Sequence, residues 1–517
     1  MMRAGNATFG MHDSKENALI TRDLRQENLA SGFTPKARAR VFLRRRWLGL
    51  ILLLHLALSL SLWQPGPDWQ GDWAGYLMQA ETLRDGTWAE LARQTDFRQA
   101  HSQPLDSPDY YPWGFPLWVL PATWWSAHTF VLAKASLLLA NVAVLWALRH
   151  WLRRDLTPPG QAALVGWLAA HHWLAGFPQQ LLAGTLFWLI SVAWLWAMDR
   201  WLSRQPVRAW RAWQMLALGG LLFLSVFVRG QGWAWVAAMP LLQLLIRWRQ
   251  GSWQRLGLDL LPWLSLGLLV ALNRALLPQG GGYLGFFFTQ SPWDTLPEMA
   301  LYYAKVAYKF FEQGPPGWAG TVPLGLLSLA LTLPWLTLGT WRSVRQHPGW
   351  TLACAVMLAV LLVYPFKEGY RFLWPLLPLP LFAVIKGVEA SRGPWRRVGR
   401  SWLLLMILST LAGSLYRAWK PPDAPRPLDP TAQAAWAYLR NHTEPQTRVT
   451  FSKPRVLTYL TDRPATFMHS RLYPQAETDL LLVPTDTLAN LADSTALWLD
   501  NQPVLWKNDD FSLFDLR

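Results

Sequence analysis

The sequence has little charge and almost no cysteine. Only 15% of its 517 residues are charged, whereas 52% are hydrophobic, and soluble domains carry about 25% charged residues. The single cysteine, Cys354, excludes an intrachain disulfide. No glycine-rich phosphate loop and no His, Cys and carboxylate cluster with metal-site spacing occurs. These deficits exclude a cytosolic soluble enzyme, a disordered scaffold and a disulfide-built secreted domain. We expect no cofactor, and a bound divalent metal stays open.

Long apolar runs are abundant. A helix that spans a membrane needs ~20 mostly apolar residues. Runs near that length predict an α-helical polytopic membrane protein with about eleven transmembrane helices, at residues 47–63, 129–148, 160–178, 181–198, 214–228, 232–246, 258–276, 322–340, 350–365, 371–388 and 401–416.

The basic residues alternate between the two sides of these runs. Of the 48 Lys and Arg residues, 27 lie in the first 46 residues and in every second connection. Lys and Arg are enriched in cytoplasmic loops, so we predict a multi-pass protein of the plasma (inner) membrane. Its N-terminus is expected in the cytoplasm and its C-terminus outside. The net charge of +16 is thus a sign of topology, and no nucleic acid partner is expected.

The domain organisation follows from the same pattern. We expect a cytoplasmic tail at 1–46, a transmembrane domain at 47–417 with outer loops at 64–128 and 277–321, and an extracytoplasmic α/β domain at 418–517. A proline-rich stretch from Pro421 to Pro430 is typical of a linker into the last domain. The elements expected there are helices at 431–441 and 455–461, strands at 448–452 and 480–484, and a closing hairpin of 503–507 and 511–516.

The first outer loop carries the most promising acidic residue. This loop holds eight of the 32 acidic residues and only three basic ones. Asp72, Tyr76 and Ala80 recur every four residues and so share one face of a helix, which Gly86 can cap. Asp72 stands directly after the first span. It is either the N-cap of this short helix or a catalytic carboxylate at the membrane surface.

Two further outer segments stand out. DSPDYYPWGFPLWVLP at 106–121 suits a loop that re-enters the membrane or lies along its interface, or an aromatic anchor. KEGYRFLWPLLPLP at 367–380 places Lys367, Glu368 and Arg371 on the outer face. These charges form either a surface ion pair of little energetic value or part of a site. Pro375 predicts an irregular end to the span beside them.

Together these segments resemble the GT-C superfamily of membrane glycosyltransferases, close to family 39 and the lipid A aminoarabinose-transferase branch. The residues that carry the resemblance are Asp72, Tyr76, Ala80 and Gly86, Tyr111-Pro112-x-Gly114-x-Pro116, Phe227-Val228-Arg229, Glu368-x-x-Arg371-Phe372-x-x-Pro375 and the C-terminal stretch from Ala434 to Ala465. Two features depart from the family pattern. The second outer loop, PQQLLAGTLFWL, has no carboxylate, and Trp113 stands where a second proline is common.

The resemblance implies transfer of a sugar from a polyprenyl-phosphate donor to a glycan, lipid or protein acceptor on the outer face of the bilayer. It implies Asp72 as the general base and Arg371 as the residue that neutralises the lipid phosphate. The other substrate-binding residues that we expect are Tyr76, Tyr111, Arg229, Lys305, Lys309, Lys367, Glu368 and Tyr370.

Two other functional classes remain open. A lipid-linked oligosaccharide polymerase or ligase also has many spans and outer arginines, but it needs no carboxylate directly after the first span. A non-enzymatic transporter is the third possibility. A proton-coupled transporter keeps ionisable groups near the membrane midplane, and the predicted spans contain almost no carboxylates. That scarcity weighs against transport.

Overall fold

The computed structural model describes residues 35–64, 66–101, 110–251, 256–278, 291–311, 321–364, 367, 369–420, 426–467, 478–488, 499 and 501–517. The chain divides into two compact units, Met1–Leu50 and Ile51–Arg517. Most of the predicted tail at 1–46 and part of the predicted linker at 421–430 lie outside the described residues. The larger unit contains both the helical bundle and the C-terminal sheet.

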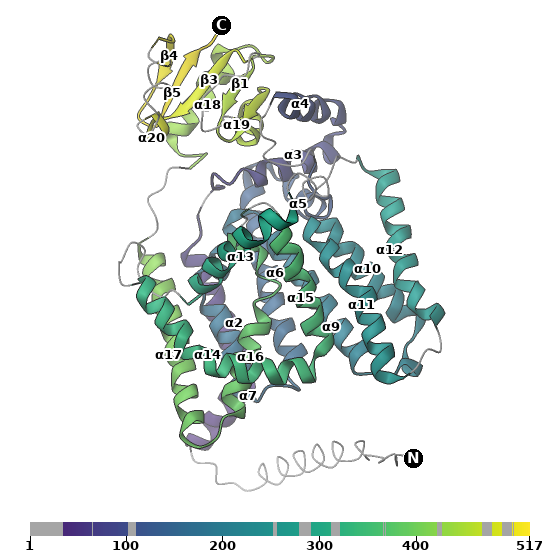
Figure 1. Cartoon of the computed structure of the whole chain (residues 1–517). Helices are drawn as coiled ribbons and strands as arrows, with labels where there is room; N and C mark the ends of the chain where they lie inside the picture. The colour runs from purple at the N-terminus through teal and green to yellow at the C-terminus, as the bar shows by residue number, and fades with distance from the viewer. Residues whose placement is uncertain are drawn as a thin grey trace. The chain divides into compact units, whose positions relative to one another are not determined.

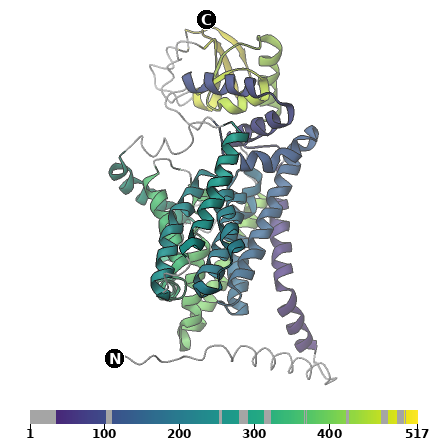
Figure 2. The same ribbon diagram turned by 90° about the vertical axis from the view of Figure 1, so that its right-hand side faces the viewer.

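Helices dominate the larger unit. One overlaps each of the eleven predicted ranges: α2 (Pro35–Ser61), α6 (Thr129–Leu152), α7 (Pro158–Ala170), α9 (Gly184–Met198), α10 (Ala212–Val228), α11 (Trp233–Gln250), α12 (Leu256–Leu276), α14 (Thr321–Gln346), α15 (Pro348–Val363), α16 (Pro378–Ala390) and α17 (Gly393–Trp419). Figure 1 places α10, α11 and α12 side by side and α14 against α16. Figure 2 shows the bundle helices running in a roughly common direction.

Among the described residues, fewer helices are long and apolar enough to cross a membrane than the eleven apolar runs predict. By length and composition, four helices in the described part of the chain can cross a membrane, or up to five if a bent pair counts as one span. That pair is His172–Gln180 and Gly184–Ser203, with a bend of 119°. The polytopic helical class is confirmed, and eleven spans remain a prediction.

One helix is longer than its predicted span, and one predicted boundary is wrong. Helix α2 begins at Pro35, and its apolar part, Arg46–Ser61, lies close to the predicted span at 47–63. The predicted span at 371–388 begins later, because residues 369–372 form a 3-10 turn and α16 starts only at Pro378. Pro375, Pro378 and Pro380 lack the N–H groups that an α-helix needs through this stretch. The predicted irregular end is therefore confirmed.

Three of the arginine-rich connections meet at one end of the bundle. Arg204, from the connection after α9, lies 2.8 Å from both Asp155 and Asp199. His347, between α14 and α15, places its two ring nitrogens 3.4 Å from Asp155 and 3.3 Å from Asp199. The charge pattern assigned these connections to the same side of the membrane, and their contacts agree with that assignment.

The opposite end of the bundle carries the outer elements. They are α3 (Asp72–Asp85), α4 (Trp88–His101), α5 (Gly114–Thr123), α13 (Pro292–Lys309) and the 3-10 turn η7 (Gly369–Phe372). Helix α3 packs on α5, and α13 packs on α15 and η7. The glycine-rich stretch 279–290 of the second outer loop lies outside the described residues.

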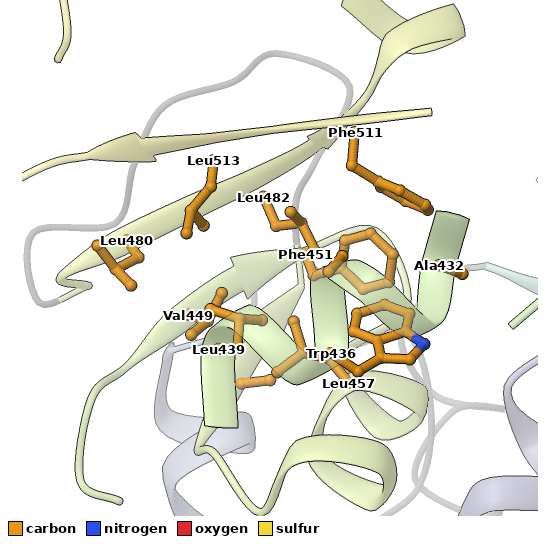
Figure 3. Packing of buried hydrophobic residues seen from close by; sticks show 12 residues of the cluster. Ala432, Trp436, Leu439, Val449, Phe451, Leu457, Leu480, Leu482, Phe511 and Leu513 are labelled. Atoms are coloured by element: carbon orange, nitrogen blue, oxygen red, sulfur yellow. The ribbon is translucent and has the colours of Figure 1, made fainter. Parts of the chain in front are cut away.

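The C-terminal domain is a small α/β fold, as predicted. Its sheet has the order β2-β1-β3-β5-β4, in which β1 is parallel to β2 and β3, and β5 is antiparallel to β3 and β4. The bounds are α18 (Pro430–His442), β1 (Val449–Phe451), α19 (Pro454–Thr461), β2 (Ala465–Phe467), β3 (Leu480–Pro484), α20 (Thr485–Leu488), β4 (Val504–Lys507) and β5 (Phe511–Asp515). Only β2 and α20 were not expected from the sequence. Figure 3 shows Trp436, Phe451 and Phe511 within its apolar core.

Candidate functional site

Asp72 joins three segments that are far apart in the sequence. Its Oδ1 accepts a hydrogen bond of 2.7 Å from the hydroxyl of Tyr111, which lies in the short segment before α5. Its Oδ2 accepts one of 3.0 Å from Nη1 of Arg371 in η7. The N-cap of α3 is Gly71, and no side chain caps this end of the helix. The reading of Asp72 as a helix cap is therefore wrong.

Local sequence explains why the Asp72 carboxylate points towards Tyr111 and Arg371. Gly71 has a φ of 72°, in the left-handed region that glycine adopts readily, and α3 starts at the next residue. Tyr76, one turn further along the same helix, packs on Tyr111 with ring centroids 4.4 Å apart. Gln79 then fixes the backbone of Tyr111 through two bonds: Nε2 donates to its carbonyl at 3.0 Å, and Oε1 accepts from its N–H at 2.8 Å.

Hydrogen bonds to the backbone of the turn η7 fix the position of Arg371. Gly369 has a φ of 70°, and its N–H donates to the hydroxyl of Tyr302 at 2.6 Å. Gln231 donates to the carbonyl of Phe372 at 3.2 Å. Tyr370 stacks on Trp173 with centroids 4.3 Å apart, and burial raises the pKa of Tyr370 to about 12, so its hydroxyl stays neutral. Arg371 therefore lies on a 3-10 turn, outside the α-helices of the bundle, and the backbone of this turn is fixed by its contacts.

The Asp72–Arg371 pair is partly accessible to solvent. The two side chains are 24% and 20% exposed. Burial on its own would raise the pKa of Asp72, but the charge of Arg371, the hydrogen bond from Tyr111 and the charge of Arg455 outweigh it and hold the pKa below its usual range. Asp72 is therefore ionised at neutral pH, and its negative charge depends on these three partners.

A second carboxylate, which sequence reasoning missed, lies in the same loop. Burial raises the pKa of Asp68 to about 6, although the N–H of Gln70 and the charges of Lys134 and Arg371 oppose the rise. Oδ1 of Asp68 accepts the Gln70 N–H at 3.0 Å. The signal was present, because Asp68 stands four residues before Asp72 in the acidic loop. The pair combines one carboxylate of lowered pKa with one of raised pKa, a pattern typical of acid–base sites.

Lys134 fixes the loop that carries Asp68. It projects from α6, is 1% exposed, and donates to the carbonyl of Gln64 at 2.7 Å and to that of Gly66. A lone lysine in an apolar helix was the sequence signal for this contact, since buried charges require partners.

Arg229 lies beside the Arg371 turn. It follows the last residue of α10, with extended backbone, and its guanidinium carbon lies 4.3 Å from the ring centroid of Phe372. Gly184 permits this position, because a Cβ there would lie 2.9 Å from Nη1 of Arg229. The structure therefore brings Asp72, Tyr76, Tyr111, Arg229, Tyr370 and Arg371 into one region.

The remaining predicted residues lie apart from this group. Lys305 and Lys309 are exposed on α13, and no contact joins either of them to Asp72, Tyr111 or Arg371 in the described part of the chain. Lys367 is exposed and pairs with Glu298 of α13 at 2.6 Å. Glu368 lies outside the described residues.

No metal site is evident where the structure is described. Among those residues, no group of three or more His, Cys, Asp or Glu side chains could hold a metal ion. The positive groups near Asp72 are guanidinium groups, which bind phosphate and carboxylate in two-point contacts.

No protein-family model and no curated protein sequence matches this chain. Solved structures do. ArnT from Cupriavidus metallidurans bound to undecaprenyl phosphate matches with a TM-score of 0.52 and 11% identity, over 90% of this chain and 97% of that one. The oligosaccharyltransferase from Archaeoglobus fulgidus in the apo form matches with a TM-score of 0.51 and 11% identity, over 86% of this chain and 70% of that one. The same enzyme tethered to an acceptor peptide also gives 0.51. At this identity the likeness shows the fold alone, and the chain shares its fold with these two proteins.

Proposed function

We propose that the protein transfers a sugar from a polyprenyl-phosphate donor to an acceptor on the outer face of the membrane. The observation that carries the proposal is the Asp72–Arg371 contact. It joins a carboxylate able to accept a proton to a guanidinium able to bind a phosphate. The ArnT structure with undecaprenyl phosphate supports a lipid phosphate as the donor's leaving group.

The reaction needs few groups from the protein. The acceptor hydroxyl oxygen attacks the anomeric carbon, and the bond from that carbon to the phosphate oxygen breaks, so that the lipid phosphate leaves with the electron pair. Asp72 takes the hydroxyl proton as general base. Arg371, with Arg229 beside it, neutralises the charge that grows on the leaving phosphate. The lipid tail stays in the bilayer while the sugar lies against the outer loop.

Arg371 also couples donor binding to the basicity of Asp72. The guanidinium keeps the pKa of Asp72 low by its charge and its hydrogen bond. A phosphate that attracts Arg371 weakens this contact, so the pKa of Asp72 rises and the carboxylate becomes a better proton acceptor. Proton transfer then follows donor binding.

A direct assay tests the proposal. Purified protein in lipid nanodiscs is incubated with a panel of synthetic polyprenyl-phosphate sugars and an extract of surface glycolipids and glycans. Mass spectrometry is expected to show release of the free lipid phosphate and a sugar added to one acceptor class. Deletion of the gene should remove the same sugar from the cell surface. Neither product with any donor would refute the proposal.

A second candidate is transfer of a preassembled oligosaccharide, because the oligosaccharyltransferase structures share the fold. Adding lipid-linked oligosaccharides, on a lipid monophosphate and on a lipid diphosphate, to the donor panel separates the two candidates. If the second candidate is right, an oligosaccharide donor is active and a monosaccharide on a lipid monophosphate is inert.

Asp68 gives a pH-dependent prediction. We propose that its negative charge raises the proton affinity of Asp72 once Arg371 has moved to the phosphate. As the pH falls through about 6, the pKa of Asp68, the carboxyl group becomes neutral and transfer should decline. Asp68→Asn should lower kcat by about 10-fold and remove this inflection from a pH–rate profile. Asp96→Asn, an exposed change on α4, is the matched control. An unchanged rate and inflection in Asp68→Asn would assign Asp68 to loop structure alone.

Membrane orientation is a separate prediction. Fusions of alkaline phosphatase, active only outside the cytoplasm, and of a fluorescent protein, fluorescent only inside it, are made after Gln205, Trp395 and Arg517. We expect fluorescence at the first two positions and phosphatase activity at the last, because the first two lie in arginine-rich connections. A cytoplasmic signal at Arg517 would reverse the orientation and place the site on the wrong face.

A further inference from the structure

The C-terminal domain contributes a buried arginine to the site. Arg455 lies in the first turn of α19, is 7% exposed, and belongs to a helix that packs on α3. Arginine is almost never fully buried unless it is paired. Its partner here belongs to the first outer loop, so this burial depends on contact between the domain and the loop.

That partner is the tyrosine that contacts Asp72. Nη1 of Arg455 donates to the hydroxyl oxygen of Tyr111, and its guanidinium carbon lies 4.6 Å from the Tyr111 ring centroid. A tyrosine hydroxyl has one proton to donate. Because its oxygen accepts from Arg455, that proton is directed at Oδ1 of Asp72, 2.7 Å away. The ionised carboxylate can only accept, and Arg455 therefore holds the Tyr111 hydroxyl in the position from which it donates to Asp72.

A glycine makes room for this chain of contacts. A Cβ on Gly75 of α3 would lie 2.6 Å from Cε2 of Tyr111 and 3.3 Å from Cδ of Arg455. The first distance is below any normal contact between carbon atoms. Only glycine at position 75 lets the tyrosine and the arginine lie this close to the helix that carries Asp72.

The same loop is anchored in the core of the domain. Trp69, between Asp68 and Asp72, packs against Trp436, Phe451 and Phe511 with ring centroids 6.2, 6.0 and 6.1 Å away. Figure 3 shows these three rings converging on one side of the core. The loop between the two carboxylates is therefore packed into the core of the C-terminal domain.

A second contact lies further along α3. The hydroxyl of Tyr459, on α19, donates to Glu81 of α3 at 3.0 Å, and its ring lies edge-on to Trp73 at 5.4 Å. Helix α3 is thus held by the domain at its beginning and near its end.

We propose that the C-terminal domain is a working part of the site, in which Arg455 is a positioning residue that orients the Asp72 carboxylate through Tyr111, while Trp69 anchors the carboxylate loop. This inference rests on the proposed function, because it assigns Arg455 a role in that reaction. The positive charge of Arg455 also helps to keep Asp72 ionised, so the role has a pH signature that docking alone would lack.

The test combines Arg455→Ala, Arg455→Lys, Tyr111→Phe and the double variant of Arg455→Ala with Tyr111→Phe. Arg517→Ala, which removes an exposed arginine of the same domain, is the control. Transfer is measured between about pH 3 and pH 8 with a polyprenyl-phosphate sugar. This range covers the titration of Asp72, whose pKa lies below its usual range, as well as that of Asp68 near pH 6. Arg455→Ala should lower kcat by about 10-fold, the scale of one hydrogen bond in a charged network. It should also move the acid limb of the profile to higher pH, because the pKa of Asp72 rises.

The other variants separate the pathway from a general effect. Arg455→Lys keeps the charge and should shift the acid limb less than Arg455→Ala does. If Arg455 acts through Tyr111, kcat of the double variant should be close to kcat of the less active single variant. A wild-type pH profile in Arg455→Ala, or fully additive losses, would overturn the positioning role.

Hydrogen exchange supplies a readout that does not need catalysis. Peptides from 72–85 should exchange faster in Arg455→Ala, while peptides from β1 and β3 keep their protection. Loss of protection throughout the domain would mean that Arg455 only stabilises it, and would also overturn the proposal. If the wild-type protein transfers no sugar but α3 still loosens in the variant, the proposed reaction fails while the ordering of α3 by Arg455 stands.

Discussion

Replacing Asp72 with asparagine should reduce sugar transfer by at least ~10²-fold, the scale of general acid–base catalysis. Asparagine keeps the size of the side chain and can still accept the bond from Tyr111. It loses the negative charge that pairs with Arg371 at 3.0 Å, and it cannot take a proton from an acceptor hydroxyl. The loss should appear in kcat with a saturating lipid donor, while the amount of protein in the membrane stays the same.

The control for this variant is Asp96→Asn. Asp96 is an exposed carboxylate on α4, so its amide variant tests the general effect of removing one negative charge from the outer region. Wild-type activity is expected for Asp96→Asn. If Asp72→Asn also transfers sugar at a near wild-type rate, the carboxylate serves only to hold Arg371, and the general base is another group.

Replacing Arg371 should act mainly on use of the donor. Arg371→Ala removes the guanidinium from the Asp72 contact and should lower kcat/KM for the lipid donor by about 10³-fold, the upper range for loss of one group that stabilises developing charge. Arg371→Lys keeps a positive charge but loses the planar, two-point geometry that suits phosphate. An intermediate loss of about 10-fold or more is expected for lysine, with KM for the acceptor unchanged.

The alternative role of Arg371 makes a different prediction. A side chain that only extends towards the membrane interface needs length and charge, so lysine would substitute without loss. Arg93→Lys, on the exposed face of α4, controls for arginine replacement elsewhere in the outer region. Wild-type kinetics in Arg371→Lys, measured with a synthetic polyprenyl-phosphate sugar, would remove Arg371 from the phosphate site.

Replacing Arg371 and replacing Asp72 should have different effects on the residue of the pair that remains. Loss of Arg371 removes the strongest group that lowers the pKa of Asp72, so residual activity in Arg371→Ala should need a higher pH than wild-type activity. Loss of Asp72 leaves Arg371 with its charge but without its carboxylate partner. The lipid phosphate should then bind as tightly as in the wild-type protein, or more tightly, although transfer fails.

Several residues of the candidate site could be predicted because they lie in recognisable local sequence patterns. Asp72 follows an apolar run inside an acidic loop, and Arg371 precedes a run of prolines. Local rules also predicted Gly86 as the residue that ends α3, and its φ of 72° confirms it. Arg455 was missed because nothing in its immediate neighbours separates it from an ordinary surface charge. Asp68 has one local signal, its place four residues before Asp72 in the acidic loop, but that spacing alone does not separate it from the other carboxylates of the loop. Their roles depend on burial, which the sequence does not give.

The sequence by itself determined the helical membrane class, the alternation of charged connections and the α/β character of the last domain. These follow from periodicity and composition, which act over stretches of about 20 residues or fewer. Only the tertiary structure decided that Asp72 pairs with a residue 299 positions away and that Arg455 reaches Tyr111 across 344 positions. Such contacts depend on how the helices pack and where the C-terminal domain docks. A hydrogen bond between distant segments leaves no local pattern, because its partners are chosen by the fold.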